Sequence, residues 1–235
     1  MSDEQARLNA IAERSLYSQQ VYDLTVEHAF EILRRHLRPG PILEMGPAEG
    51  TMTAMLAGLD RPLTLVEGSE RFCADLVARY PQAEVVCSLF ETFEPTQAYG
   101  TIVLGHVLEH VEAPVELLRR VKGWLAPGGA VFSAVPNSAS LHRQAGVLMG
   151  MLPREDALND LDRAHGHRRV YDPAGLRRDI EAAGLRVEAT GGYFMKLTSQ
   201  GQLAQIATPE MIRAFCALGE RYPDTAAEIY AVATR

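Results

Sequence analysis

Short apolar runs alternate with longer segments of helical periodicity along most of this chain. The apolar runs occupy residues 41–45, 63–66, 83–87, 101–104, 130–135, 185–189 and 229–233. The helical segments occupy residues 19–37, 51–59, 70–80, 114–125, 173–183 and 209–220. Parallel strands need a long crossover between them, which is usually a helix. The alternation therefore predicts an α/β fold with an open parallel sheet.

The composition is that of a globular protein. Of 235 residues, 47% are hydrophobic and 23% are charged, which is enough apolar side chain for a sizeable core. Cys73, Cys87 and Cys216 stand singly, which argues against a disulfide framework and against a thiolate zinc site. No apolar run approaches the roughly 18–20 residues that cross a bilayer, and the charged N-terminus lacks the apolar core of a secretory signal. We therefore expect a cytoplasmic protein without membrane contact.

The charge balance bears on the choice of partners. Lys and Arg number 23 against 30 Asp and Glu, so the formal net charge is −7. A negative protein repels phosphate backbones unless its basic residues are clustered. Nucleic acid is therefore not an expected partner.

One interruption breaks the alternation. Residues 138–172, after the fifth apolar run, contain an apolar stretch and then a polar run rich in His and Arg. The chain shows no repeat or linker, so we interpret residues 1–235 as a single domain. Within it, residues 1–40 are predicted to form an N-terminal helical cover and residues 138–172 a lid-like insertion.

A glycine-containing turn follows the first predicted strand. It spans residues 46–50 and precedes a helix, and glycine there lets the backbone approach a ligand closely. Glu67 follows Gly46 by 21 residues and ends the second predicted strand, where a carboxylate can accept both hydroxyls of a ribose. Because ligands of open α/β sheets bind at the carboxyl ends of the strands, these features predict an adenosine-type cofactor.

A series of blocks in this order resembles the class I S-adenosylmethionine-dependent methyltransferases. The matching blocks are residues 42–50, 66–69, 102–111, 125–129 and 135–137. The third block contains the sequence HVLEHV, and the fourth reads LAPGG. The nearest branch contains quinone-biosynthesis O-methyltransferases and many small-molecule methyltransferases. The resemblance implies a Rossmann-like seven-stranded sheet, here with an insertion after the fifth strand.

Two departures from the family pattern concern the first and fourth strands. The usual turn is G-x-G-x-G, and its middle glycine is Ala48 in this chain. Alanine still permits close approach, so cofactor binding is expected to survive. The acidic residue that usually precedes the fourth strand is replaced by Tyr99-Gly100. That replacement removes a common structural carboxylate.

The resemblance also implies where S-adenosylmethionine, and its product S-adenosylhomocysteine, would bind. Glu44 and Gly46 would lie beside the methionine portion, and Glu67 would bind the ribose. Residues 88–90 would border the adenine, and residues 105–106 would face the sulfonium and the acceptor. The expected cofactor residues are Glu44, Gly46, Gly50, Glu67, Gly68, Ser88, Leu89, Phe90, Gly105 and His106.

The polar run from Asp162 to Tyr171 concentrates ionisable side chains. Imidazole titrates near neutrality, so His165 or His167 could take a proton from the acceptor. With His106, at the strand end beside the expected sulfonium, these are the candidate catalytic residues. The run could instead be a solvated loop, or Asp162, His165 and His167 could form a metal site. No metal is predicted to be required.

Further polar and aromatic residues could contact the acceptor. Arg168 and Arg169 could hold an anionic group, Tyr17 could fold over the cofactor, and the residues after the sixth strand could wall the acceptor pocket. The candidate acceptor residues are Tyr17, Asn137, His142, Arg168, Arg169, Tyr193 and Lys196.

Together these features predict methyl transfer from S-adenosylmethionine to an oxygen or nitrogen of a small-molecule metabolite. Oxygen is favoured by the nearest branch and by the histidine-rich run, and an insertion at a strand end suggests a closed pocket. One alternative is a nicotinamide-dependent oxidoreductase, because the glycine turn and Glu67 also suit a dinucleotide. Another is a non-catalytic methyltransferase-like subunit. The expected partners are the small-molecule acceptor and, as an option, a second copy of the chain in a homodimer.

Overall fold

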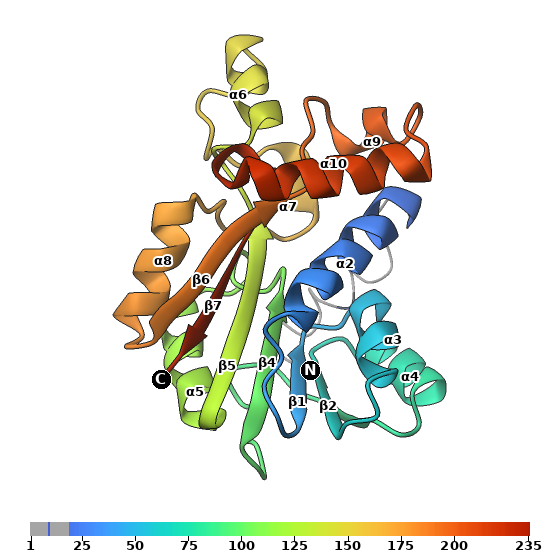
Figure 1. Ribbon diagram of the computed structural model, residues 1–235, viewed down its shortest axis with the longest axis vertical. Helices are drawn as coiled ribbons and strands as arrows, with labels where there is room; N and C mark the ends of the chain where they lie inside the picture. The colour runs from blue at the N-terminus through green and yellow to red at the C-terminus, as the bar shows by residue number, and fades with distance from the viewer. Residues whose placement is uncertain (1–8, 10–18) are drawn as a thin grey trace.

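The computed structural model describes residues 9 and 19–235. Its centre is a seven-stranded sheet in the order β3-β2-β1-β4-β5-β7-β6, with helices on both faces (Figure 1). The strands are β1 Ile42–Met45, β2 Leu63–Glu67, β3 Glu84–Cys87, β4 Tyr99–Gly105, β5 Leu125–Pro136, β6 Arg186–Tyr193 and β7 Glu228–Thr234. Each predicted apolar run coincides with one of these strands, so the Rossmann-like seven-stranded sheet is confirmed.

The helices between the strands also follow the predicted alternation. They are α2 Gln19–Arg34, α3 Thr51–Ala57, α4 Glu70–Arg79, α5 Pro114–Trp124, α6 Leu141–Leu148, α7 Asp160–Ala164, α8 Pro173–Ala182, α9 Gln200–Leu203 and α10 Pro209–Arg221, with a 3-10 turn η1 Pro223–Thr225. Local signals explain several starts: Ser69, Asp172 and Thr208 accept backbone N–H groups as N-caps of α4, α8 and α10. The three helices α6, α7 and α9 were not separately predicted.

The last strand departs from the expected parallel arrangement. β1 to β5 pair parallel, but β7 lies between β5 and β6 and runs antiparallel to both. A strand inside the sheet is buried on both faces whether it runs parallel or antiparallel to its neighbours. The apolar composition of the run therefore does not show its direction. The reversal places Glu228, the first residue of β7, beside Pro136 at the carboxyl end of β5.

The beginnings of β4 and β5 also differ from the expected boundaries. Residues 126–129, which lie between the predicted helix and the predicted strand, form the irregular start of β5. This strand begins by pairing Leu125 with buried Tyr99 and shifts register before Thr101. Beside Tyr99, a Cβ on Gly100 would lie 1.9 Å from the Pro39 carbonyl oxygen. The position of the usual acidic residue is therefore taken by Tyr99, whose ring is buried, and by Gly100, where the backbone passes close to Pro39.

The core has two halves, one on each face of the sheet. α5 and α8 cover one half, with Leu118 and Ile180 packed against Leu43 and Ile102. α2, α3, α4 and α10 cover the other, whose members include Leu33, Leu56, Leu76, Ile212, Ile42 and Val103. Successive residues of β1 and of β4 therefore point their side chains to opposite faces of the sheet, as in any β-strand.

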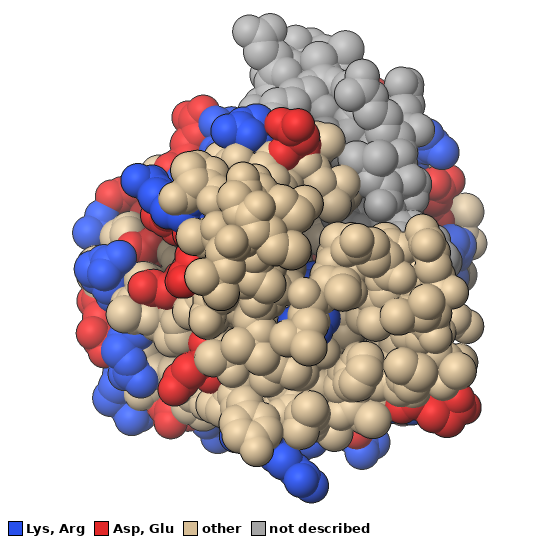
Figure 2. Space-filling model, turned by 90° about the horizontal axis from the view of Figure 1, so that it is seen from above, with Lys and Arg blue, Asp and Glu red and all other residues tan. Residues whose placement is uncertain are grey.

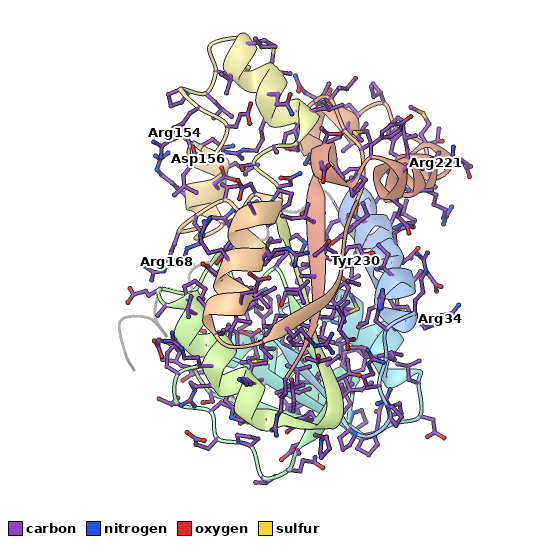
Figure 3. All side chains as sticks on the ribbon, turned by 60° about the vertical axis from the view of Figure 1, so that its left-hand side comes forward. Arg34, Arg154, Asp156, Arg168, Arg221 and Tyr230 are labelled. Atoms are coloured by element: carbon purple, nitrogen blue, oxygen red, sulfur yellow. The ribbon has the colours of Figure 1, made fainter. Side chains whose placement is uncertain are left out.

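Residues 138–172 contain α6 and α7 and connect β5 to α8. α6 projects beyond the upper end of the sheet in Figure 1. The buried Arg143 of α6 lies 3.2 Å from Asp162 of α7, so an ion pair joins the two helices. Between them, Arg154 and Asp156 point outward (Figure 3) and form an exposed ion pair at 2.6 Å. Whether this segment moves as a lid remains a prediction.

The upper end of the molecule is mostly uncharged. Viewed from above, acidic and basic side chains gather mainly toward the rim (Figure 2). Exposed apolar side chains include Leu148, Met149 and Met151. Among residues 9 and 19–235, none of the helices combines the length and apolar character that crossing a bilayer requires.

Candidate active site

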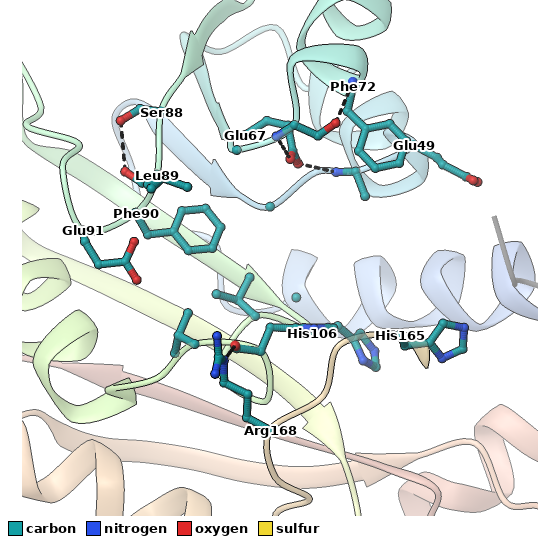
Figure 4. Close-up of a pocket in the computed structure, with 18 of the residues that line it drawn as sticks. Glu49, Glu67, Phe72, Ser88, Leu89, Phe90, Glu91, His106, His165 and Arg168 are labelled. Carbon is teal, nitrogen blue, oxygen red and sulfur yellow. Dashed lines mark hydrogen bonds between the residues drawn. The ribbon is translucent and has the colours of Figure 1, made fainter. Parts of the chain in front are cut away.

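Two adjoining cavities open at the carboxyl ends of the parallel strands. The first cavity, which contains Glu67, has a volume of about 400 Å³ and is drawn in Figure 4. The second cavity, which contains Lys196, has a volume of about 390 Å³. The two share Tyr22, Gly46, Gly105, His106, His110 and His165. Because they meet along the end of β4, ligands in the two cavities can touch there.

The turn after β1 forms one wall of the first cavity. Gly46 has a φ of +69°, and a Cβ there would lie 3.2 Å from Val107 Cγ2 and 3.3 Å from Phe90 Cζ. A side chain would therefore fill space that a ligand could use. Ala48 has a φ of 48°, in the left-handed region that glycine enters most easily. Alanine thus keeps the backbone shape of the usual glycine.

Gly50 differs from the other predicted cofactor residues. It lines neither cavity. Its φ is +78°, and an added Cβ would lie 3.1 Å from Leu76 and 3.2 Å from Tyr80. Gly50 therefore shapes the turn before α3 and packs against α4. Its expected direct contact with the cofactor is not supported by this position.

Glu67 is held in place by backbone donors. Its Oε1 accepts the Ser69 N–H at 2.7 Å and its Oε2 accepts the Ala48 N–H at 3.1 Å (Figure 4). Burial raises the pKa of Glu67, and these backbone hydrogen bonds oppose that rise. Each carboxylate oxygen can accept more than one hydrogen bond. The fixed carboxylate can therefore still accept ligand hydroxyls.

A second wall of the first cavity follows β3. Ser88, Leu89 and Phe90 line it together, as the resemblance implied, and Gly68 lies beside Glu67. Figure 4 shows Phe90 and Phe72 on either side of the cavity. Phe72 was not predicted, although its place three residues after the N-cap Ser69 turns it back toward the strand ends.

The second cavity gathers residues that are distant in the sequence. α2 contributes Tyr22, Thr25, Val26 and Ala29, and β4 and β5 contribute Val103, Phe132 and Ala134. Of the predicted site residues outside the shared set, it is lined by Glu44, Asn137, His142, His167, Tyr193 and Lys196. Glu44 therefore lies on the second cavity rather than on the first. Tyr17 lies outside the described residues.

Asn137 lines the second cavity and also makes several hydrogen bonds within the fold. Its Nδ2 donates to the carbonyl oxygens of Asp224 at 3.0 Å and Ala226 at 2.8 Å, and its Oδ1 accepts the Ala139 N–H at 3.0 Å. The side chain is fully buried. These hydrogen bonds join the end of β5 to the segment before β7, and the predicted contact of Asn137 with the acceptor stays a prediction.

The two arginines of the polar run hold the segment after β4. Arg169 donates to the carbonyl oxygens of Leu108 at 2.7 Å and Glu112 at 3.0 Å, and also to that of Val111. Arg168 donates through Nε to the His110 carbonyl oxygen at 2.8 Å and pairs with the Glu112 carboxylate at 3.1 Å.

These contacts change the predicted role of both arginines. Arg169 lines neither cavity, because its guanidinium is committed to backbone carbonyls. Arg168 lines the first cavity and not the second. Neither side chain is therefore placed to clamp an anionic group of an acceptor in the second cavity.

His106 stands where the two cavities meet. Its φ of 56° is unusual for a residue with a side chain, and such strain gathers at functional sites. Nδ1 lies 3.2 Å from Glu109 Oε1, and Nε2 lies 3.8 Å from Glu228 Oε2. Burial alone would lower the pKa of His106, but the hydrogen bond to Glu109 and the two carboxylate charges raise it to about 9.

The two carboxylates beside His106 were missed as site residues. Glu109 is fully buried; burial alone would raise its pKa, but His106 and the neighbouring imidazoles lower it to about 2. Burial raises the pKa of Glu228. Glu109 lies inside the HVLEHV block and could have been singled out, whereas only the reversal of β7 brings Glu228 to this place.

Burial raises the pKa of Glu44, whereas the pKa of the buried Glu109 is lowered by its neighbours. Glu44 is 3% exposed, and its Oε2 accepts the Thr53 hydroxyl at 2.7 Å. Burial raises its pKa to about 7, Thr53 opposes the rise, and the charge of Glu67 adds to it. Glu44 therefore changes charge near neutrality within the wall of the second cavity.

The sequence matches the family described as "Methyltransferase domain" over residues 18–190. This chain therefore belongs to the class I S-adenosylmethionine-dependent methyltransferases, as its motif order predicted. S-adenosylmethionine is the cofactor of that class, and the first cavity has the expected strand-end acid and glycine turn.

Individual relatives agree with the family but differ in how much of the chain they cover. The ubiquinone biosynthesis O-methyltransferase of Aeromonas salmonicida (strain A449) is 33% identical over 113 residues, which are 46% of this chain and 44% of that protein. This chain therefore aligns with less than half of that relative. The CcbJ methyltransferase of Streptomyces caelestis has a TM-score of 0.65 at 17% identity, over 99% of both chains.

A second solved structure gives the same picture of the fold. The DhpI–SAM–HEP complex has a TM-score of 0.65 at 18% identity and covers 99% of this chain and 96% of DhpI. At such low identity these structures support the fold and not the acceptor.

Proposed function

We propose that this chain transfers a methyl group from S-adenosylmethionine in the first cavity to an oxygen of a small molecule in the second. The observation that carries the proposal is the meeting of the two cavities at Gly105 and His106. Methyl transfer needs the nucleophile in line with the sulfonium, and positioning is the main task of the protein. A shared edge between two pockets provides such a place.

His106 is proposed to position the acceptor. Its ring is fixed by Glu109, faces Glu228 and borders both cavities. His165 also borders both cavities and is proposed as the group that receives the acceptor proton. His167 borders only the second cavity, beside Asp162. The catalytic assignment therefore rests first on His106 and His165.

The second cavity favours a compact acceptor with both apolar and polar parts. Its volume of about 390 Å³ suits a small molecule. Val103 and Phe132 give it an apolar wall, while His142 and Lys196 bring nitrogen atoms to it. Burial lowers the pKa of Lys196, and Glu228 opposes that effect. We propose that Lys196 binds a polar or anionic group of the acceptor.

Oxygen is preferred over nitrogen as the methylated atom. The support is the relative that is 33% identical, which is an O-methyltransferase, together with the imidazole of His165 at the junction, which suits deprotonation of a hydroxyl. Nitrogen methylation is the alternative outcome of the test below.

The test combines binding with product analysis. Calorimetry with S-adenosylmethionine, S-adenosylhomocysteine and NAD should show micromolar binding of the first two and none of NAD. A panel of hydroxylated and aminated metabolites with methyl-labelled cofactor, read by mass spectrometry and NMR, should then yield an O-methyl product. Binding of NAD alone would favour the oxidoreductase. Cofactor binding without transfer to any member would favour the non-catalytic subunit.

A further inference from the structure

A histidine and carboxylate cluster lies between the two cavities. One ligand atom from each of Glu109, His110 and His167 falls within 4.8 Å of the other two. The rings of His110 and His167 meet edge to face, with centroids 4.8 Å apart. Glu109 Oε1 is 4.0 Å from His110 Nε2. Two segments separated by a long stretch of chain thus bring three donors to one point.

Glu109 carries an acceptor that the protein does not satisfy. Its side chain is fully buried, and its Oε2 has no hydrogen-bond partner in the part of the chain that the structure describes. A buried carboxylate oxygen without a partner is costly. A cation bound through both carboxylate oxygens of Glu109 would satisfy this oxygen.

A second carboxylate lies behind His167. Asp162 Oδ1 is 3.4 Å from His167 Nδ1, although the angle does not make a hydrogen bond and this buried nitrogen has no partner among the described residues. Asp162 is itself fixed by Arg143 at 3.2 Å and by the Asn159 N–H at 3.0 Å. Histidine ligands of metals usually donate their second ring nitrogen to such a carboxylate, which sets the tautomer and the ring orientation. A small rotation of the His167 ring would let Nδ1 donate to Asp162 in this way, with Nε2 as the ligand nitrogen.

The backbone around the other two donors is held by fixed contacts. The Glu109 carbonyl oxygen accepts the Arg168 N–H at 2.8 Å, and the His110 carbonyl oxygen accepts the Arg168 Nε at 2.8 Å. The hydrogen bonds from Arg169 hold the carbonyls on either side of this pair. The donors therefore lie on a segment that is already shaped, as a binding site requires.

We propose that Glu109, His110 and His167 bind one divalent transition-metal ion. Two imidazoles and one carboxylate form a donor set typical of Zn²⁺ and its first-row neighbours, and not of Mg²⁺ or Ca²⁺, which prefer oxygen. Ligands about 2.0–2.2 Å from one tetrahedral zinc ion stand roughly 3.3–3.6 Å apart. The three donor atoms here lie within 4.8 Å of one another, so side-chain rotation must bring the widest pair closer by more than about 1 Å.

The place of the proposed ion, beside both cavities, gives it a role in the reaction. Three protein ligands leave a coordination position open, which in catalytic sites holds water or substrate. His110 borders both cavities and His167 borders the second, so a bound ion could contact an acceptor oxygen and favour its deprotonated form. This role rests on the proposed function, whereas metal binding itself does not.

The test measures metal binding without cofactor or acceptor. The full chain, free of any polyhistidine tag and stripped with a chelator, is titrated with Zn²⁺ by calorimetry and with Co²⁺ by visible absorption. We expect one ion per chain, with ligand-field bands of a Co²⁺ site that contains nitrogen ligands. Because no methyl transfer is measured, failure of the proposed function leaves this result intact.

Variants locate the ion. Glu109→Gln, His110→Gln and His167→Gln should each weaken binding at least about tenfold, and Asp162→Asn should weaken it about 10- to 100-fold. His142→Ala removes an imidazole that lines the second cavity outside the cluster, and should leave metal affinity unchanged. Circular dichroism checks the fold of each variant, and a misfolded one is replaced by the Asn substitution. The proposal is overturned if the wild-type chain binds no ion, or if folded variants of the three ligands bind it unchanged.

Discussion

The two cavities are built in different ways. The first draws on residues 46–112, with Tyr22, His165 and Arg168 at its edge, and its central carboxylate is fixed by backbone N–H groups. The second draws on segments from Tyr22 to Glu228 and is lined by side chains that titrate. The first is therefore a backbone cradle around one carboxylate, whereas the second sets buried titratable side chains, among them Glu44 and Lys196, against an apolar wall. We therefore expect events in the second cavity to depend on pH more strongly than cofactor binding in the first.

The largest expected effect is at the junction. His106→Asn removes the imidazole, while asparagine tolerates the left-handed backbone. If His106 positions the acceptor, turnover should fall about 10²–10³-fold, which is the usual loss for one positioned donor. Affinity for S-adenosylhomocysteine should change far less. Steady-state kinetics measures turnover, and calorimetry measures affinity for S-adenosylhomocysteine. An equal loss in turnover and in affinity would mean that His106 contacts the cofactor and does not position the acceptor.

The next effect concerns the charge of Glu44. Its folded pKa of about 7 exceeds the ordinary value of 4.5, so the folded state keeps a proton that the unfolded chain releases. Its stabilising contribution is therefore present below pH 4.5 and is lost as the pH rises through about 7. Relative to Glu44→Gln, the wild-type free energy of unfolding should fall by up to about 3 kcal/mol across this range.

Denaturant unfolding of both proteins without ligand, at intervals from pH 4 to 8, measures the difference. The amide introduced by Glu44→Gln keeps an oxygen that can accept the Thr53 hydroxyl, so the comparison isolates the charge. Parallel stability curves for the two proteins would show that Glu44 does not titrate in this window.

A smaller effect is expected in the first cavity. Glu67→Ala removes the acceptor proposed for the ribose hydroxyls, and each hydrogen bond to a charged group is worth roughly 1.5–3 kcal/mol. Affinity for S-adenosylhomocysteine should fall at least about tenfold. Calorimetry measures this, with Glu49→Ala, on the same cavity, as the control. Unchanged affinity in a folded Glu67→Ala protein would mean that the carboxylate does not face the ribose.

The smallest effect is expected at Ala48. Ala48→Gly relieves a left-handed conformation that costs roughly 1–2 kcal/mol, but it adds roughly 0.4–1 kcal/mol of unfolded-chain entropy. The free energy of unfolding should therefore change by about 1 kcal/mol or less, with cofactor affinity nearly constant. The matched Gly46→Ala protein should lose affinity, because its Cβ enters the first cavity. A large loss of affinity in Ala48→Gly would contradict the backbone-cradle description.

Sequence reasoning reached the first cavity because its residues follow strand ends in chain order. Gly46, Glu67 and the residues at 88–90 each come directly after a predicted strand, and parallel strand ends meet at one edge. Gly50 shows the limit of this reasoning, since the same turn contains one glycine beside the ligand space and another packed against a helix. Spacing alone does not distinguish the two.

The second cavity was harder to predict because tertiary contacts decide which polar groups remain available. Arg169 and Asn137 are residue types that suit ligand binding, yet backbone carbonyls occupy both of them. Glu228 carries no local motif and reaches the site only through a reversed strand. His106, by contrast, was predicted because the family resemblance places the residues after the fourth strand beside the sulfonium, and the preceding apolar run marked the end of that strand.

The antiparallel course of β7 also bears on the order in which the site can form during synthesis. Because this strand enters the sheet from the opposite end, it delivers its first residue, Glu228, to His106 at 3.8 Å. β6 reaches the sheet only through β7. A growing chain can therefore pair β1 to β5, add His165 and Arg168, and complete the first cavity before β7 is made, since segments fold as they emerge. The second cavity must wait until residues 228–234 have been made, so a nascent chain would hold a methyl donor before it could select an acceptor.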